Sequence, residues 1–153
     1  MNAIERHLNE QLSKTFFDLI DENVNSDNPN LEWITQLYID IRDRLLKYLN
    51  PESKMYKELS AEFDVELFKQ MIENNVFDID SLVNLISNTF NWVLRLEAPV
   101  RNISTREAKT RVLNSKPEKM ISTFIREIHI SLNQIDEDTE TYEYITSMIK
   151  TKS

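Results

Sequence analysis

The chain has 153 residues, of which 41% are apolar and 29% charged, which is the composition of one globular domain and not of a disordered tail. Its formal net charge of −8 and the absence of any apolar run of ~18 residues argue against general binding to nucleic acid and against a membrane span. Because cysteine and glycine are both absent, disulfides, thiolate zinc sites and glycine-rich phosphate loops are excluded, and we expect a cytoplasmic protein without a cofactor.

Apolar residues recur at helical spacing through the first half of the chain. We expect a helix over residues 3–24 whose core-facing stripe is Ile4, Leu8, Leu12, Phe16, Ile20 and Val24. Pro29 and Pro51 are placed to start the next two helices, and Asp64 to cap a short fourth one. Without glycine, helix C-termini need asparagine, which tolerates the left-handed conformation; the candidates are Asn25, Asn50, Asn75 and Asn114.

The most apolar helix follows Asp78 and Asp80, either of which can be its N-cap. We expect this helix to be central and largely buried through Leu82, Leu85, Ile86, Thr89, Phe90, Val93 and Leu94. Pro99 lacks a backbone donor and clashes with the preceding turn, so the helix must end or kink near Ala98 and leave Arg101 on a bend.

Beyond this proline corner, two capping boxes predict helix starts, Ser104 with Glu107 and Ser115 with Glu118. A further core stripe consists of Ile121, Phe124, Ile125, Ile128, Leu132 and Ile135. The acidic run from Asp136 to Glu143 predicts the N-terminus of a last helix, docked weakly through Tyr142, Ile145 and Ile149. No strand pattern is present, so residues 1–153 are expected to form one all-α, single-domain bundle of seven or eight amphipathic helices.

Arg101 is the polar residue that stands out. A guanidinium binds a carboxylate with two parallel hydrogen bonds, and Asp78 or Asp80 are the expected partners across the corner. We favour this structural role, in a corner made of Pro99, Arg101, Asp78 and Asp80, over a role in partner binding.

Basic residues concentrate between positions 95 and 119, where seven cations face three carboxylates. A local positive patch on an acidic protein fits an acidic or phosphorylated protein partner; the alternative is a solvated helix face. The candidate partner-binding residues are Arg95, Arg101, Arg106, Lys109, Arg111, Lys116 and Lys119.

No motif predicts catalysis or metal binding. His7 and His129 belong to no metal-binding helical motif, and Asp18 with Glu22 lacks a complete ligand set. A nucleophile elbow needs glycine, which the chain lacks. The two tryptophans are expected in helices, with Trp92 more buried than Trp33.

Ala98, Pro99, Val100 and Arg101 match the Cys-Ala-Pro-Val/Ala-Arg-Asp pattern of the T-complex protein 11 family, which this chain resembles. The resemblance continues in the same order through Thr15-Phe16-Phe17-Asp18, Ile41 to Leu49 with Pro51, Asp64 with Leu67, Lys69 and Gln70, and Phe77-Asp78-Ile79 with Leu82. It covers about residues 2–148 but only the front portion of the longer family domain. Glu97 replaces the family's cysteine and removes any thiol-dependent role, whereas Asn102, in place of aspartate, keeps a side chain that can cap a helix.

The resemblance implies an all-helical, non-enzymatic protein linked to cyclic-AMP and protein-kinase-A signalling, with roles in sperm physiology in mammals and growth control in yeast. The abundance of asparagine, isoleucine and lysine is typical of an AT-rich genome, such as that of a giant virus, in which case the partner would be a host protein and the location the host cytoplasm or the virion. The leading hypothesis is a protein–protein interaction module. The alternative is a structural or assembly protein that self-associates, as a homo-oligomer, through an apolar helix face.

Overall fold

The computed structural model describes the backbone of residues 3–152 and the side chains of residues 14–150. This part of the chain is helical and contains no strand, so the all-α prediction is confirmed. Its elements are α1 (Ala3–Val24), α2 (Glu32–Leu46), α3 (Lys54–Glu62), α4 (Val65–Glu73), α5 (Ile79–Leu96), the 3-10 turn η1 (Pro99–Arg101), α6 (Asn102–Leu113), the 3-10 turn η2 (Pro117–Lys119) and α7 (Met120–Lys152).

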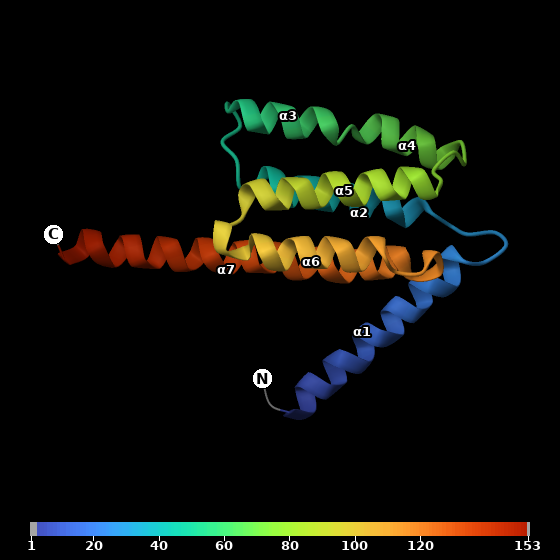
Figure 1. Cartoon of the computed structure of the whole chain (residues 1–153), viewed down its shortest axis with the longest axis horizontal. Coiled ribbons are helices and arrows are strands. Elements are labelled where there is room, and N and C mark those ends of the chain that lie inside the picture. The colour runs from blue at the N-terminus through green and yellow to red at the C-terminus, as the bar shows by residue number, and fades with distance from the viewer. Residues whose placement is uncertain (1–2, 153) are drawn as a thin grey trace.

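The helices lie in three layers (Figure 1): α3 and α4 form one, α2 and α5 the middle one, and α6 and α7 the third. One cluster of buried side chains joins the layers. Helix α1 contacts α7 near η2 and then runs away from the body, and the C-terminal part of α7 projects beyond the turn between α5 and α6. Within the described residues, no helix combines the length and the apolar character that crossing a membrane requires.

Helix α5 is the central element, as its apolar pattern predicts. Ile86, Phe90 and Val93 are fully buried, and the ring of Phe90 meets that of Phe124 of α7 edge to face. The hydroxyl of Thr89 is buried without penalty because it donates to the carbonyl of Leu85 one turn earlier. Trp92 is buried and Trp33 only half-buried, which confirms that prediction.

Helix caps follow local side-chain chemistry. Asp64 accepts a hydrogen bond from the backbone of Leu67, and Asp78 accepts one from Ser81, so Asp78 and not Asp80 caps α5. Of the four candidate asparagines, Asn75 after α4 takes the left-handed conformation, with φ 56°. Asn114 caps α6 at its C-terminus with right-handed helical angles instead.

Several predicted helix starts are wrong. Helix α2 begins at Glu32 and not at Pro29, and α3 begins after Ser53, whose hydroxyl caps it, and not at Pro51. Neither capping box forms, because prolines set both turns: Pro99 starts η1, so that Ser104 lies inside α6, and Pro117 starts η2 after Lys116.

The separate last helix is also wrong, because α7 continues unbroken through the acidic run. Neither proline nor glycine interrupts the run, and two of its carboxylates bind arginines, Asp136 with Arg44 and Asp138 with Arg101. The expected docking through Tyr142, Ile145 and Ile149 is not found within the described residues, where these side chains are 72%, 51% and 64% exposed.

The stripe predicted for residues 3–24 is only partly core-facing. Ile20 is buried, but Phe16 is 55% exposed, because α1 leaves the body along its length. The side chains of Ile4, Leu8 and Leu12 lie outside the described residues.

Candidate partner-binding surface at the proline corner

The break between α5 and α6 forms where the sequence predicts it. Helix α5 ends at Leu96, and Glu97 and Ala98 adopt extended angles, which a residue directly before proline, here Ala98, favours. Pro99 opens η1, which the backbone of Arg101 closes by donating to the carbonyl of Ala98 at 2.9 Å. Arg101 therefore lies on a tight bend directly before α6.

Arg101 binds Asp138 of α7, and neither Asp78 nor Asp80. Its Nε and Nη2 donate to the two carboxylate oxygens of Asp138 at 3.1 and 3.0 Å. This paired hydrogen bonding raises the pKa of Arg101 and lowers that of Asp138. Both side chains are about one-third exposed, at 37% and 33%, so this ion pair lies at the surface, where it ties the corner to α7 like a clamp.

Behind the clamp, a carboxyl group is buried that the sequence does not reveal. Glu97 is 8% exposed; one of its oxygens accepts a hydrogen bond from Thr105, and the other has no partner among the described residues. Burial raises the pKa of Glu97, against the opposing effects of the Thr105 hydrogen bond and the Arg101 charge. The prediction that Asn102 caps a helix is wrong: Asn102 is the first residue of α6, Arg101 holds the N-cap position, and no side-chain cap hydrogen bond forms. The Oδ1 of Asn102 is also buried without a hydrogen-bond partner among the described residues.

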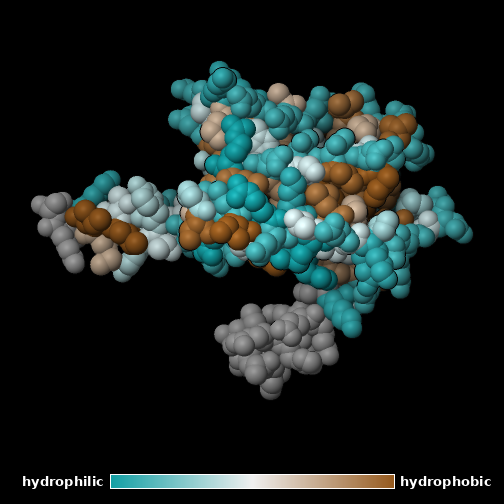
Figure 2. Space-filling model, viewed as in Figure 1, coloured by the Kyte–Doolittle hydropathy of each residue, from teal (hydrophilic) through white to brown (hydrophobic). Residues whose placement is uncertain are grey.

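The outer side of the corner is apolar and open to solvent. Val100 is 84% exposed and Ile103 72% exposed. On α7, Tyr142 lies one turn beyond Asp138 on the same helical face, and Ile145 and Ile149 continue this line. Figure 2 shows hydrophobic side chains both where α7 leaves the body and on its projecting end. The stripe that docks α7 thus runs on past the body, and its residues there are exposed among the described part of the chain.

Three of the seven predicted basic residues are already neutralised within the chain. Arg95 lies 3.4 Å from Glu58 and over the ring of Trp92. Arg101 is bound by Asp138, and both nitrogens of one edge of the Arg111 guanidinium bind Glu127.

The other four cations have no carboxylate within 4 Å among the described residues. Arg106 and Lys109 lie one turn apart on α6, next to Ile103, and the ammonium of Lys109 donates a hydrogen bond to the neutral side chain of Asn91 at 3.2 Å. Lys116 and Lys119 lie at η2, at the opposite end of α6. The predicted basic stretch therefore divides into two separate pairs, of which Arg106 and Lys109 adjoin the corner.

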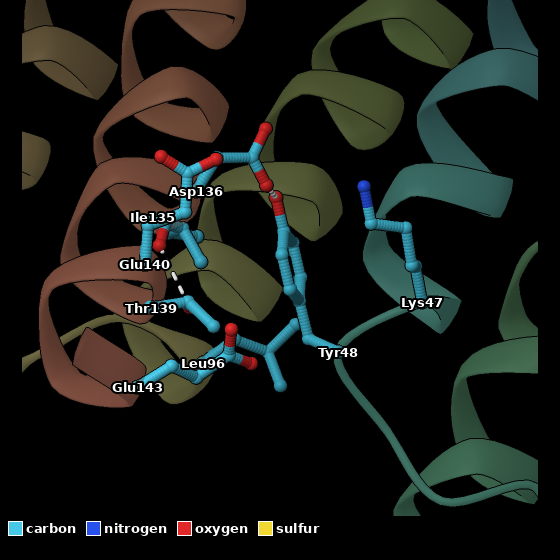
Figure 3. A pocket seen from close by; sticks show the side chains of 8 residues that line it. All are labelled: Lys47, Tyr48, Leu96, Ile135, Asp136, Thr139, Glu140 and Glu143. Carbon is cyan, nitrogen blue, oxygen red and sulfur yellow. Dashed lines mark hydrogen bonds between the residues drawn. The ribbon is translucent and has the colours of Figure 1, made fainter. Parts of the chain in front are cut away.

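An acidic hollow of about 580 Å³ lies between the end of α2 and α7 (Figure 3). Its walls include Lys47, Glu140 and Glu143, and the hydroxyl of Tyr48 points at Asp136, to which it donates at 2.5 Å. That hydrogen bond is the largest cause of the lowered pKa of Asp136. Glu140 and Glu143 have no ion-pair partner within 4 Å among the described residues, so the hollow offers two carboxylates to a cationic group.

No cluster of three or more possible metal ligands occurs among the described residues. His129 contacts Arg44, with Nδ1 3.3 Å from Nη1, and loss of solvent around the ring together with the Arg44 charge lowers the pKa of His129. The side chain of His7 lies outside the described residues.

Comparison with known proteins shows the family to which the chain is similar. The sequence profile described as T-complex protein 11 matches residues 1–140. Two human proteins, T-complex protein 11-like X-linked proteins 1 and 2, are each 27% identical over 110 residues, which is 71% of this chain. The aligned part spans only 21% of either human protein. No solved structure matches the chain significantly.

Proposed function

Because this chain belongs to the T-complex protein 11 family, we propose that it is a non-enzymatic module that binds another protein through the surface at its proline corner. We define this corner surface as Val100, Ile103, Arg106 and Lys109 with Tyr142, Ile145 and Ile149 of α7. The observation that carries the proposal is the exposure of its apolar members, which ranges from 51% to 84%. Large apolar side chains gathered on one exposed face are typical of a protein interaction site.

The chemistry of the surface favours a partner that is apolar at its centre and acidic or phosphorylated at its edge. Val100 and Ile103 supply apolar contacts, while Arg106 and Lys109 bring positive charge and have no carboxylate within 4 Å among the described residues. The charge of Arg106 also acts on the buried carboxyl of Glu97, whose pKa it lowers. Since the whole chain carries −8, attraction to an acidic partner is local to this face and does not extend over the molecule.

The family suggests a setting for this binding, in cyclic-AMP and protein-kinase-A signalling in the cytoplasm. If the chain comes from a virus, the partner is a host protein. The chain aligns with only about a fifth of the length of the human relatives, so its link to this pathway is a proposal.

Affinity capture from the native cell or host tests the corner surface with matched variants. Ile103→Asp, and separately Arg106→Glu with Lys109→Glu, should each reduce capture of the same partner at least ~10-fold. Ile130→Asp is the control, because Ile130 is a 48% exposed isoleucine of α7 that lies outside the corner surface. Arg111 is left unchanged, since its reversal would place a carboxylate against Glu127. Equal capture by wild type and both corner variants would refute the proposal.

Self-association is the second candidate, and the bare end of α7 favours it. Tyr142, Ile145, Met148 and Ile149 are all exposed and recur at helical spacing, so two copies can bury the same stripe against each other. Light scattering at increasing concentration tests this, with Ile145→Asp as the variant. A strict monomer at high concentration would eliminate self-association, and a dimer unaffected by the variant would exclude this stripe.

A further inference from the structure

A second apolar surface lies in a groove between α4 and the first half of α5. These two segments lie at the opposite end of the body from the corner surface (Figure 1). The floor of the groove is aromatic. The ring of Tyr38 stacks on that of Phe68 with centroids 4.0 Å apart, and Phe63 and Phe77 lie beside these two rings at 5.3 Å. Four aromatic rings from different parts of the chain therefore meet under one opening.

The walls of the groove include an exposed apolar side chain. Leu67 lines the groove and is 55% exposed; Val76, next to the lining residue Phe77, and Ile79, the first residue of α5, are 55% and 47% exposed. The opposite wall carries Asn84 and Asn88, one turn apart on α5, and neither amide hydrogen-bonds another described residue. The groove thus offers a hydrophobic floor and two unused polar groups along one side, and Figure 2 shows hydrophobic atoms on this side of the body.

The charge around the groove is negative. No lysine or arginine lines it, whereas Glu62 does. The segment from Glu62 to Ser81, which builds much of its walls, carries six carboxylates and one lysine, a net charge of 1 − 6 = −5. At the floor, burial raises the pKa of Tyr38 to about 12; the negative charge of Asp64 raises it further, and the positive charge of Arg42 has a smaller, opposing effect.

We infer that this groove binds a basic amphipathic helix of a partner protein. Its volume of about 280 Å³ accommodates a few side chains of a partner. Apolar side chains one turn apart on the bound helix enter between Leu67 and Asn84, and its lysines or arginines face the surrounding carboxylates. The corner surface has the opposite charge preference, so the two surfaces select different partners.

Fluorescence anisotropy of the full chain with a labelled synthetic helix of leucine and lysine at amphipathic spacing tests this inference. Leu67→Lys should weaken binding at least ~10-fold, because it places a like charge in the groove. Ile130→Lys is the matched control: it adds the same charge at a similarly exposed apolar position on α7 and should change the affinity less than ~2-fold, the level expected for a distant surface charge. Asn88→Lys, on the other wall, provides a second groove variant with the same expected loss.

A second labelled helix, in which glutamate replaces every lysine, separates charge recognition from simple hydrophobic binding. It should bind at least ~10-fold more weakly than the lysine helix, and added salt should reduce the difference. Equal weakening by Leu67→Lys and Ile130→Lys would overturn the site, and equal affinity for the two helices would overturn the charge preference. Circular dichroism of each variant confirms that the fold is intact.

Discussion

Two isoleucines of α7 lie in opposite surroundings, and replacing each by alanine separates the docked part of this helix from its exposed end. Ile128 is 0% exposed, so Ile128→Ala loses buried carbons and leaves a cavity, for a destabilisation of about 3 kcal/mol. At about 2–4 °C per kcal/mol for a chain of this length, Tm should fall by about 6–12 °C. Ile145 is 51% exposed, and alanine is the better helix former, so Ile145→Ala should change stability by less than about 0.5 kcal/mol.

Urea unfolding followed by far-ultraviolet circular dichroism measures both changes, at a low protein concentration that limits self-association. The two variants share residue type, helix and substitution, so they differ only in what surrounds the side chain. If Ile145→Ala destabilised the chain as much as Ile128→Ala, the end of α7 would be docked in solution and the reasoning for the corner surface would fail.

Of three further predictions, two concern polar groups and one concerns a backbone position. Tyr48→Phe removes the main cause of the lowered pKa of Asp136, so that pKa should rise in a carboxyl NMR titration. The variant should also lose about 1 kcal/mol of stability at neutral pH, and this loss should shrink as the pH falls through the pKa of Asp136. An unmoved titration would show that the hydrogen bond is absent in solution. Because burial raises the pKa of Glu97, the folded state binds the proton more tightly, and the free energy of unfolding of the wild type should decline as the pH rises from the ordinary glutamate range through the raised pKa. Glu97→Gln should lack this decline and be more stable than the wild type at neutral pH. If the wild type and the variant had the same dependence of stability on pH, burial of the charge would be contradicted. At Asn75, alanine should cost about 1 kcal/mol and glycine nothing, and equal stability of the two variants would argue against the left-handed conformation.

Features that depend on neighbouring residues could be predicted from the sequence. The break at Pro99 follows from the covalent structure of proline, and the caps at Asp64 and Asp78 need a partner only three residues away. The buried face of α5 follows from its apolar spacing. Because these interactions are local, packing against the rest of the chain changes them little.

Features that depend on distant residues could not be predicted. The sequence does not say which of several carboxylates lies near Arg101, because Asp138 is 37 positions away and is brought close only by the fold. The same holds for Arg95 and Arg111, whose neutralisation by Glu58 and Glu127 turned one predicted basic stretch into two pairs. The aromatic floor of the groove likewise joins residues that no short sequence window contains.

Helix α7 shows a further limit of sequence reasoning. Ile128 and Ile145 follow the same apolar period, yet one is buried and the other is exposed. Periodicity tells which face of a helix is apolar, but it does not tell whether another element covers that face. The apolar period thus predicts that the end of α7 is docked, whereas its apolar residues are exposed and form part of the candidate surface.

Hydrogen exchange along α7, measured by mass spectrometry for the chain alone and for the chain with its captured partner, tests the central claim most directly. In the free chain, amides of residues 141–150 should exchange far faster than those of residues 124–135, because only the latter belong to the packed core. On binding, protection should appear at residues 141–150 and at 100–109 together. Uniform protection of α7 in the free chain, or binding that leaves both segments unchanged, would contradict the account.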